Sequence, residues 1–352
     1  MDAFLKNAKN GWDLPRAGLN GDREHQDFIP EQVINSRYIQ RFYTPSDALQ
    51  KNEKYFRNID KNIFEPPFVL FKKGQKNRKL TASYIDYFAF CTTACYVFNG
   101  NVESDKKKAL AAIFNSKITT YILFMVSSSW GIEREQIFMD EVMDIPAIIN
   151  LLNQKNLSKI VGHFDEIMSG IKSDFLKKDY SKLEEKIDKV ILKDVLGMTD
   201  REMVIINDSL EYSLDLFENK QKSKALLPIT DVTEYAERIS SEMNEFLNNQ
   251  KIFCSATTFK MPHFSPLMMI KLSFGTSEGG VIKSKENLDK ELTQLDKILW
   301  QKKATNIYFR KKLNYKTGNE IFIVRPNQRR FWTQSMAIED ASELILEILN
   351  EV

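Results

Sequence analysis

PPFVLFKKGQKNRKLTASYIDYFAFCTTACYVFNG, residues 66–100, contains the clearest strand signals in the chain. The apolar run Phe68–Phe71 predicts a short strand that leads into a basic turn. The aromatic and threonine-rich run after that turn predicts one or two further strands, which Asn99-Gly100 closes. Apolar residues spaced three and four apart then predict a helix over 105–126.

The patterns outside this region complete an α+β chain in three parts. Residues 1–146 are expected to form a mixed-sheet α+β domain that begins with an irregular segment of about 62 residues, rich in glycine, proline and aromatic residues. Residues 147–248 carry helical spacing, including a capping box at Thr199 and Glu202. Residues 249–352 are expected to form a small α+β unit in the order strand, strand, helix, strand, strand, helix, with its first helix over 285–300 and the next strand over 303–315.

The composition restricts the cellular setting. The chain has 352 residues, a net charge of only +2 and 43% hydrophobic residues, so it can build a sizeable core but does not indicate a nucleic-acid partner by bulk charge. It has no apolar run of membrane-spanning length and no apolar signal core at its start. Cys91, Cys95 and Cys254 lack the neighbours of a metal site. We therefore expect a soluble cytoplasmic protein with no membrane partner and with buried reduced thiols.

No catalytic centre is recognisable. The chain has no glycine-rich phosphate loop after a strand, no nucleophile motif and no histidine cluster, so we expect no catalytic residue, cofactor or metal. Glu65-Pro66-Pro67-Phe68 resembles the Asp/Asn/Ser-Pro-Pro-aromatic signature of amino-group methyltransferases. Glutamate is one methylene longer than the acceptor of that signature, and no methyl-donor loop lies upstream. The alternative is that the tetrapeptide is only the start of a strand, and we favour it.

Two segments concentrate positive charge. In the first, five cations fall within eight positions of the turn and can neutralise phosphates, or can simply solvate the turn: Lys72, Lys73, Lys76, Arg78 and Lys79. The second lies between Trp300 and Trp332 and has nine basic residues against Glu320 alone, a local charge of +8. Aromatic residues interleave with it, which favours a nucleic-acid surface over a charged sheet edge. Its candidate contacts are Arg310, Lys311, Lys312, Arg325, Arg329 and Arg330.

A family resemblance follows from the order of several motifs. Residues 106–154 contain Ala-Ile-Phe-Asn-Ser-Lys at 112–117, then Ser-Trp-Gly at 129–131 followed by Arg134, then Asp-Ile-Pro at 144–146. This order resembles the closing half of a target-recognition domain of Type I specificity subunits and of fused, Type IIG-like N6-adenine DNA methyltransferases. Residues 183–212 and 324–341 are similar to segments that follow such domains, and the likeness covers about 64–215 and 318–345.

The resemblance implies sequence-specific recognition of double-stranded DNA within a restriction-modification or phage-defence system. It implies no methyl transfer by this chain, which lacks the catalytic domain and is either a separate subunit or part of a longer enzyme. The implied partners are an N6-adenine methyltransferase subunit or domain and a restriction subunit. Trp130 and Arg134 join the DNA contacts, although Arg134, between Glu133 and Glu135, can also pair within the fold. The alternatives are a protein–protein scaffold of a defence complex and a metal-dependent enzyme without a spaced motif.

Overall fold

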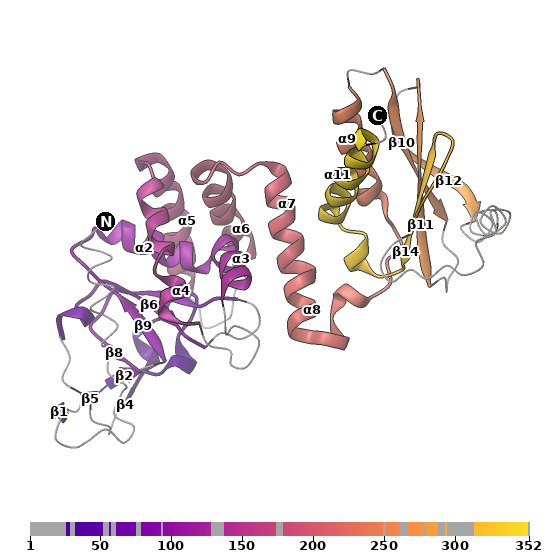
Figure 1. The fold of residues 1–352 in the computed structure, drawn as a ribbon. Coiled ribbons are helices and arrows are strands. Elements are labelled where there is room, and N and C mark those ends of the chain that lie inside the picture. The colour runs from indigo at the N-terminus through magenta and orange to yellow at the C-terminus, as the bar shows by residue number, and fades with distance from the viewer. Residues whose placement is uncertain are drawn as a thin grey trace. The chain divides into compact units, whose positions relative to one another are not determined.

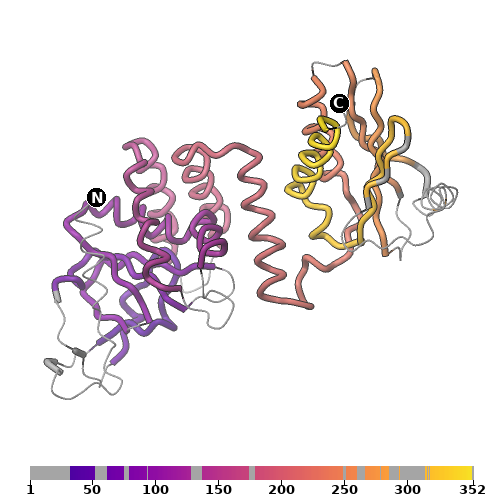
Figure 2. The backbone as a smooth tube through the Cα atoms, viewed as in Figure 1, coloured from indigo at the N-terminus to yellow at the C-terminus, as the bar shows by residue number. Residues whose placement is uncertain are grey.

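The computed structural model divides into two compact units, 1–199 and 200–352. Figure 2 traces the backbone of each unit. The described residues are 26–28, 32–51, 56–57, 61–74, 79–92, 94–127, 137–173, 179–248, 251–260, 266–277, 279–287, 293 and 313–350. The protein is α+β, as predicted, and its sheets of three or more strands contain both parallel and antiparallel pairs.

Unit 1 is built around a four-stranded sheet in the order β3-β7-β6-β9. Strand β6 is antiparallel to both β7 and β9, whereas β3 is parallel to β7. A three-stranded sheet, β4-β2-β8, and the pair β1-β5 contain the other strands among the described residues of this unit. The strands are β1 (Gln26–Phe28), β2 (Gln32–Ile34), β3 (Phe42–Tyr43), β4 (Leu49–Lys51), β5 (Phe56–Arg57), β6 (Phe68–Lys72), β7 (Ala82–Ile85), β8 (Phe90–Cys91) and β9 (Cys95–Phe98).

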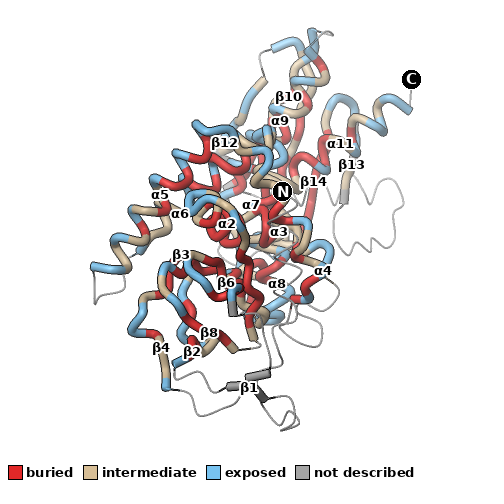
Figure 3. Tube along the Cα trace, turned by 90° about the vertical axis from the view of Figure 1, so that its left-hand side faces the viewer, coloured by how far each residue is buried: buried red, intermediate tan, exposed pale blue. Residues whose placement is uncertain are grey.

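The first four residues of strand β6 are apolar and buried because both faces of the strand are covered. The Phe71 ring lies 5.0 Å from the ring of Phe114 on helix α2 (Ser104–Asn115). Phe68 and Leu70 belong instead to a core that includes residues of β2 and β8. Figure 3 colours the chain by burial, and most of β6 has the buried colour. The prediction of a strand at Phe68–Phe71 is confirmed, and the region after the turn forms three short strands rather than one or two.

The helix predicted over 105–126 is two helices, α2 and α3 (Lys117–Val126), bent by 55°. Ser116 separates them with extended backbone angles, and its hydroxyl accepts from the N–H of Thr119. A serine cap of this kind satisfies the first amide groups of the second helix, so one apolar stripe continues across two helices. The periodicity identified the helical residues and could not identify the bend.

The helical section belongs to both units. Helix α5 (Gln154–Ser173) packs on α2 and on α6 (Ser181–Lys189) in unit 1. The helices of unit 2 are α7 (Asp200–Asp208), α8 (Leu214–Asn219), α9 (Thr233–Leu247) and α11 (Gln334–Asn350). Because α5 covers the N-terminal sheet and α9 covers the C-terminal one, the division falls after Thr199 and differs from the predicted boundaries at 146 and 248. The shorter helical elements are η3 (Ser36–Tyr38), η4 (Ser46–Ala48), η5 (Lys61–Phe64), α4 (Met139–Val142), η6 (Ile145–Leu151), η7 (Val190–Val195), η8 (Ser209–Ser213), η9 (Lys220–Lys222), η10 (Lys224–Leu226) and η11 (Arg329–Phe331).

Unit 2 has a five-stranded sheet in the order β12-β10-β11-β14-β13, with α9 and α11 side by side on one face (Figure 1). Its strands are β10 (Phe253–Lys260), β11 (Leu267–Gly275), β12 (Gly280–Asn287), β13 (Leu313–Thr317) and β14 (Glu320–Pro326). Strand β12 was not predicted, and it takes the first three residues of the helix expected over 285–300. The rest of that helix, apart from Thr293, and residues 303–312 of the next predicted strand lie outside the described residues.

Candidate nucleic-acid interface

The basic turn of unit 1 joins the two central strands of the four-stranded sheet. Lys72 closes β6, and its backbone N–H donates to the carbonyl of Thr81 over 3.0 Å, just before β7 begins. The side chains of both strands are buried except that of Lys72. Loops held by rigid strands of this kind are common positions for binding residues. Lys76 and Arg78, at the middle of the turn, lie outside the described residues.

Lys73 is engaged within the fold. Its ammonium lies 4.4 Å from the centre of the Tyr96 ring, a cation–π distance. Burial lowers the pKa of Lys73, and the nearby Cys95 and Cys91 thiols oppose that effect. Its backbone also bridges two segments, since its N–H donates to Ala94 and its carbonyl accepts from Ile137. Lys73 is therefore a poorer phosphate ligand than the exposed Lys79.

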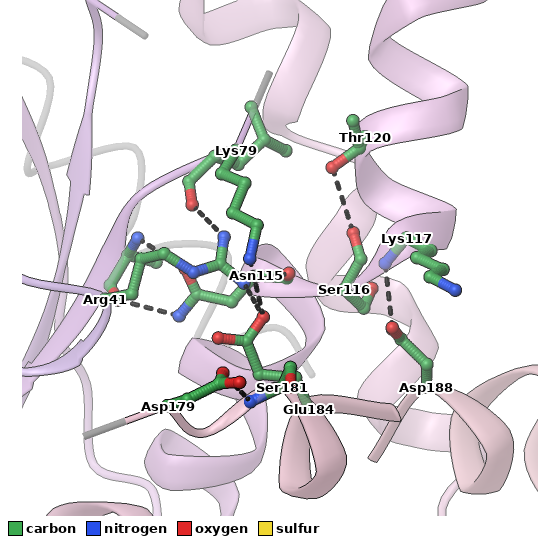
Figure 4. Close-up of polar contacts among 12 residues, drawn as sticks. Arg41, Lys79, Asn115, Ser116, Lys117, Thr120, Asp179, Ser181, Glu184 and Asp188 are labelled. Atoms are coloured by element: carbon green, nitrogen blue, oxygen red, sulfur yellow. Dashed lines mark hydrogen bonds and ion pairs between the residues drawn. The ribbon is translucent and has the colours of Figure 1, made fainter. Parts of the chain in front are cut away.

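Lys79 is exposed and lies beside an ion pair that the sequence did not indicate (Figure 4). Its side chain is 62% exposed, and its ammonium is 3.7 Å from the Glu184 carboxylate. The guanidinium of Arg41 donates to the same carboxylate over 2.8 Å. Because Arg41 and Glu184 are 143 positions apart, no local pattern could connect them.

Arg41 and Asn115 fix the end of the turn to helix α2. The guanidinium of Arg41 donates to the carbonyls of Leu80 and Asn115. The Asn115 side chain donates to the carbonyl of Ala82 over 2.8 Å and accepts from its N–H over 3.0 Å. Asn115 therefore pairs with the first residue of β7 much as a neighbouring strand would. This contact gives the Asn115 of the resemblance motif a structural role.

The next residues of that motif join α3 to α6. The N–H of Lys117, at the start of α3, donates to the Asp188 carboxylate over 2.9 Å (Figure 4). Burial raises the pKa of Asp188 to about 6, and the hydrogen bond from Lys117 opposes that shift. A carboxylate at a helix N-terminus accepts from amide groups that lack partners within the helix. Ser116 is therefore the N-cap of α3, and Lys117 is the first residue of that helix.

The surface around Lys79 carries charges of both signs. A hydrogen bond from the Ser181 N–H, together with Lys79 and Lys182, lowers the pKa of the exposed Asp179. Glu184 already has Arg41 as a partner. Anions near a lysine weaken its attraction for phosphate, so Glu184 and Asp179 reduce the attraction of Lys79 for a phosphate.

Arg325 corrects the sequence-based interpretation of unit 2. It was predicted to contact DNA, but its side chain is 1% exposed and forms an ion pair with Asp340. The guanidinium also donates to the carbonyl of Phe331 over 2.7 Å, and the hydroxyl of Tyr235 donates to Asp340. The Arg325 side chain extends from β14 toward α9 and α11, which carry Tyr235 and Asp340. Arg325 is a core residue and cannot reach a phosphate.

The other predicted contacts fall into two groups. Arg329 is exposed on η11, and Arg330, beside it, donates to the side chain of Gln328 and lies 4.5 Å from the Phe331 ring. These two residues belong to unit 2, whereas the lysine turn belongs to unit 1. The remaining five predicted contacts lie outside the described residues: Trp130, Arg134, Arg310, Lys311 and Lys312.

The Glu65-Pro66-Pro67-Phe68 tetrapeptide is the start of a strand. The Phe68 ring, the first residue of β6, is fully buried and cannot stack on a base. The carbonyl of Glu65 accepts from the Asn99 side chain over 2.8 Å, and that of Pro67 accepts from the Lys107 ammonium over 2.7 Å. Both carbonyls therefore have partners within the fold, and the aromatic ring belongs to the core.

Three further observations concern the described part of the chain. Within it, no group of three or more His, Cys, Asp or Glu side chains is placed to hold a metal ion. Cys91, Cys95 and Cys254 are buried and form no disulfide, as predicted. No single described helix is long and apolar enough to cross a membrane, although α2 and α3 taken together, across their bend, meet that test of length and composition.

Arg41, Glu184 and Asp188 are the site residues that the sequence did not reveal. Each is an ordinary charged residue in a local context without a motif, and only the packing of α6 against the sheet domain gives it a partner. No protein-family model matches the sequence. A search of curated proteins finds no match either.

Proposed function

We propose that the chain recognises double-stranded DNA in a sequence-specific manner as part of an adenine-N6 methyltransferase of a restriction-modification or phage-defence system. In this proposal a partner subunit or domain carries the methyltransferase centre, and a restriction subunit completes the system. The motif order at 106–154 supports the assignment. The fold is compatible with it, since a mixed sheet is followed by the 20-residue helix α5 and by α6.

The lysine turn between β6 and β7 is the single observation that carries the proposal. It places up to five cations, Lys72 to Lys79, on one connection between two rigid strands, and Lys79 is exposed. Each lysine that neutralises a phosphate releases a condensed counterion, which favours binding without regard to sequence. Rigid flanking strands limit the entropy lost when such a turn docks on the duplex.

Sequence reading would come from different residues. Phosphate contacts position a protein on DNA, whereas contacts to base edges specify the sequence. Arg134 has the planar fork that binds guanine with two hydrogen bonds, and Trp130 lies close to it in the sequence. Changing Arg134 to alanine should therefore alter the preference between sequences by about 1–3 kcal/mol rather than weaken all binding equally.

Neutralising the turn tests the proposal. The variant Lys72→Gln/Lys76→Gln/Lys79→Gln keeps Lys73, whose cation–π contact belongs to the fold. Glutamine at 79 avoids a like charge beside Glu184. Fluorescence anisotropy with duplex DNA of mixed sequence, over a range of salt concentrations, gives the slope of log affinity against log salt. We expect weaker binding to all sequences and a slope shallower by about 0.9 for each phosphate that the turn no longer neutralises.

A matched variant controls for net charge. Lys106→Gln/Lys155→Gln/Lys189→Gln removes three cations from helices of the same unit, α2, α5 and α6, and leaves the turn unchanged. It should leave the affinity and the salt slope close to those of the original chain. Equal DNA affinity of the turn variant and the original at low salt, with the fold intact by circular dichroism, would reject DNA contact by this turn.

A protein–protein scaffold of a defence complex is the alternative. It is favoured by the partners that Lys73 and Lys79 have within the fold, in Tyr96 and Glu184. A scaffold would bind duplex DNA weakly even at low salt and would show no sequence preference. The anisotropy experiment therefore separates the two functions without further reagents.

A further inference from the structure

Unit 2 has a surface groove of about 430 Å³ formed by three of its helices. Arg201 of α7 lies at its edge, and the Arg201 guanidinium donates to the hydroxyl of Ser342 on α11 over 3.0 Å. Phe246 of α9 and Ile345 of α11 form an apolar floor, since both are partly buried against the core. Leu346 of α11 lines the groove and is 60% exposed.

A second exposed leucine extends the apolar strip along α11. Leu349 is 55% exposed and lies three positions after Leu346, on the same side of the helix. Single exposed leucines are common on protein surfaces and need no explanation. Two of them in line, next to a groove with an apolar floor, form a continuous strip that another helix can cover.

Acidic side chains flank this strip on both helices. Helix α11 has four acidic residues and no lysine or arginine in its sequence, and α9 has four glutamates and Arg238 alone. Asp340 is neutralised by Arg325 in the core. Glu242 forms ion pairs with Arg238, at 2.5 Å, and with Arg201, at 3.6 Å. The other six glutamates are exposed: Glu234, Glu237, Glu245, Glu339, Glu343 and Glu347.

Spacing places the acidic row of α11 beside Leu346. Glu339, Glu343 and Glu347 follow one another at intervals of four, so they form one ridge along α11. Leu346 lies next to that ridge, and Glu245 lines the groove on the α9 side. The surface therefore has an apolar centre with negative charge on either side.

We infer that this face of α9 and α11 binds an amphipathic helix of a partner protein, whose apolar stripe is flanked by lysines or arginines. The apolar stripe would cover Leu346, Leu349 and the groove floor, and the flanking cations would face the glutamates. Charge complementarity selects such a helix over an acidic or uncharged one. It also disfavours DNA, because phosphates would face the same glutamates. Neither the apolar strip nor the flanking glutamates belong to the lysine turn of unit 1.

A defined peptide tests the inference on the whole chain. The probe is a fluorescein-labelled 18-residue peptide of leucine and lysine, with leucines at helical spacing and lysines on both flanks. Two comparison peptides are a scrambled sequence of the same composition and a leucine–glutamate version. Fluorescence anisotropy should show saturable binding of the leucine–lysine helix, at least about tenfold tighter than either comparison peptide.

Two variants locate the binding surface. Leu346→Ser/Leu349→Ser removes the exposed leucines, and Glu343→Lys/Glu347→Lys reverses two flanking charges. Each should weaken binding at least about tenfold. The matched controls, Leu151→Ser/Leu227→Ser and Glu103→Lys/Glu185→Lys, change exposed residues away from the groove and should bind as the original chain does. All four change exposed side chains, so circular dichroism and thermal melting should be unchanged.

Three results would overturn the inference. Equal binding of the helical and scrambled peptides would indicate unspecific charge attraction. Unchanged binding by both groove variants would place the peptide elsewhere. Sedimentation of the free chain as a dimer that Leu346→Ser/Leu349→Ser dissociates would identify a second copy of the chain, rather than a basic helix, as the occupant. DNA binding is measured separately on the same variants, so failure here is distinguishable from failure of DNA recognition.

Discussion

Arg41 in unit 1 and Arg325 in unit 2 both bind a carboxylate and backbone carbonyls, yet they have different structural roles. Arg41 is 19% exposed and binds Glu184 together with the carbonyls of Leu80 and Asn115. Arg325 is 1% exposed and binds Asp340 and the carbonyl of Phe331. The first arginine joins a helix to a sheet domain near the surface, and the second is enclosed in the core between a sheet and two helices.

Cations in basic, aromatic-rich segments therefore have to be interpreted one at a time. Arg325 sits in a segment of charge +8, which made it a candidate for DNA contact, yet the carboxylate that it binds is a buried aspartate fifteen residues later. Arginine is the cation that tolerates such burial best, because its guanidinium is weakly hydrated and offers several donors. A local excess of positive charge does not establish that each basic residue of the segment is exposed.

Breaking the pair in unit 2 should have the largest effect. Asp340→Ala would leave the Arg325 guanidinium buried without its carboxylate, and it would also remove the acceptor of the Tyr235 hydroxyl. We expect the free energy of unfolding, measured in urea, to fall by about 3–5 kcal/mol. Arg325→Met/Asp340→Leu replaces both charges with apolar groups and should recover most of that loss. A loss below about 1 kcal/mol in the single variant would show that the pair contributes little.

Asp188 gives an effect that depends on pH. Its folded-state pKa of about 6 is above the ordinary value, so its ionised form destabilises the fold above pH 6, and that cost disappears as the pH falls from 6 toward 4. Asp188→Asn removes the charge and keeps an acceptor for the Lys117 N–H. We expect it to raise the free energy of unfolding by about 1–3 kcal/mol at neutral pH, with the gain vanishing near pH 4. Urea titrations at several pH values measure this, and a less stable variant at neutral pH would contradict it.

Removing Arg41 should have a smaller effect than breaking the core pair, because Arg41 is partly solvated. Arg41→Met would leave Glu184 and two carbonyls without this donor. We expect a loss of about 1–2 kcal/mol, and little rescue by Arg41→Lys, whose single ammonium cannot reach three acceptors. Arg37→Met, an exposed arginine over the Tyr38 ring, is the matched control and should change stability by less than about 0.5 kcal/mol. Similar losses in the two variants would remove the special role given to Arg41.

Lys79→Gln should have the smallest effect on folding. Its ammonium is 3.7 Å from Glu184 and largely solvated, and such surface pairs contribute between about 0 and 1 kcal/mol. We expect a change below about 0.5 kcal/mol in thermal or urea unfolding. A clear loss of stability would mean that Lys79 belongs to the Arg41 network, and its use as a probe of DNA contact would then be unsound.

Periodic segments were predictable, and contacts between distant segments were not. The strand at Phe68–Phe71, the helix after Thr199 and the closing helix α11 all follow from short-range spacing. The bend at Ser116 and strand β12 were missed, because a capping serine within an apolar stripe and a strand of mostly polar residues give weak local signals. Of the candidate DNA contacts that the structure describes, Lys79 and Arg329 are exposed, Lys72, Lys73 and Arg330 are half-buried, and Arg325 is buried.

The α+β class, the helical character of the middle section and the concentration of cations in two segments all follow from the amino-acid sequence. Which unit each helix joins, and which cations are enclosed or exposed, became clear only from the packing of the folded chain. The reason is that helix and strand formation depends on residues within a few positions of one another. The surroundings of Arg41 and Arg325 depend on carboxylates brought close only by packing, across 143 and 15 positions of the chain.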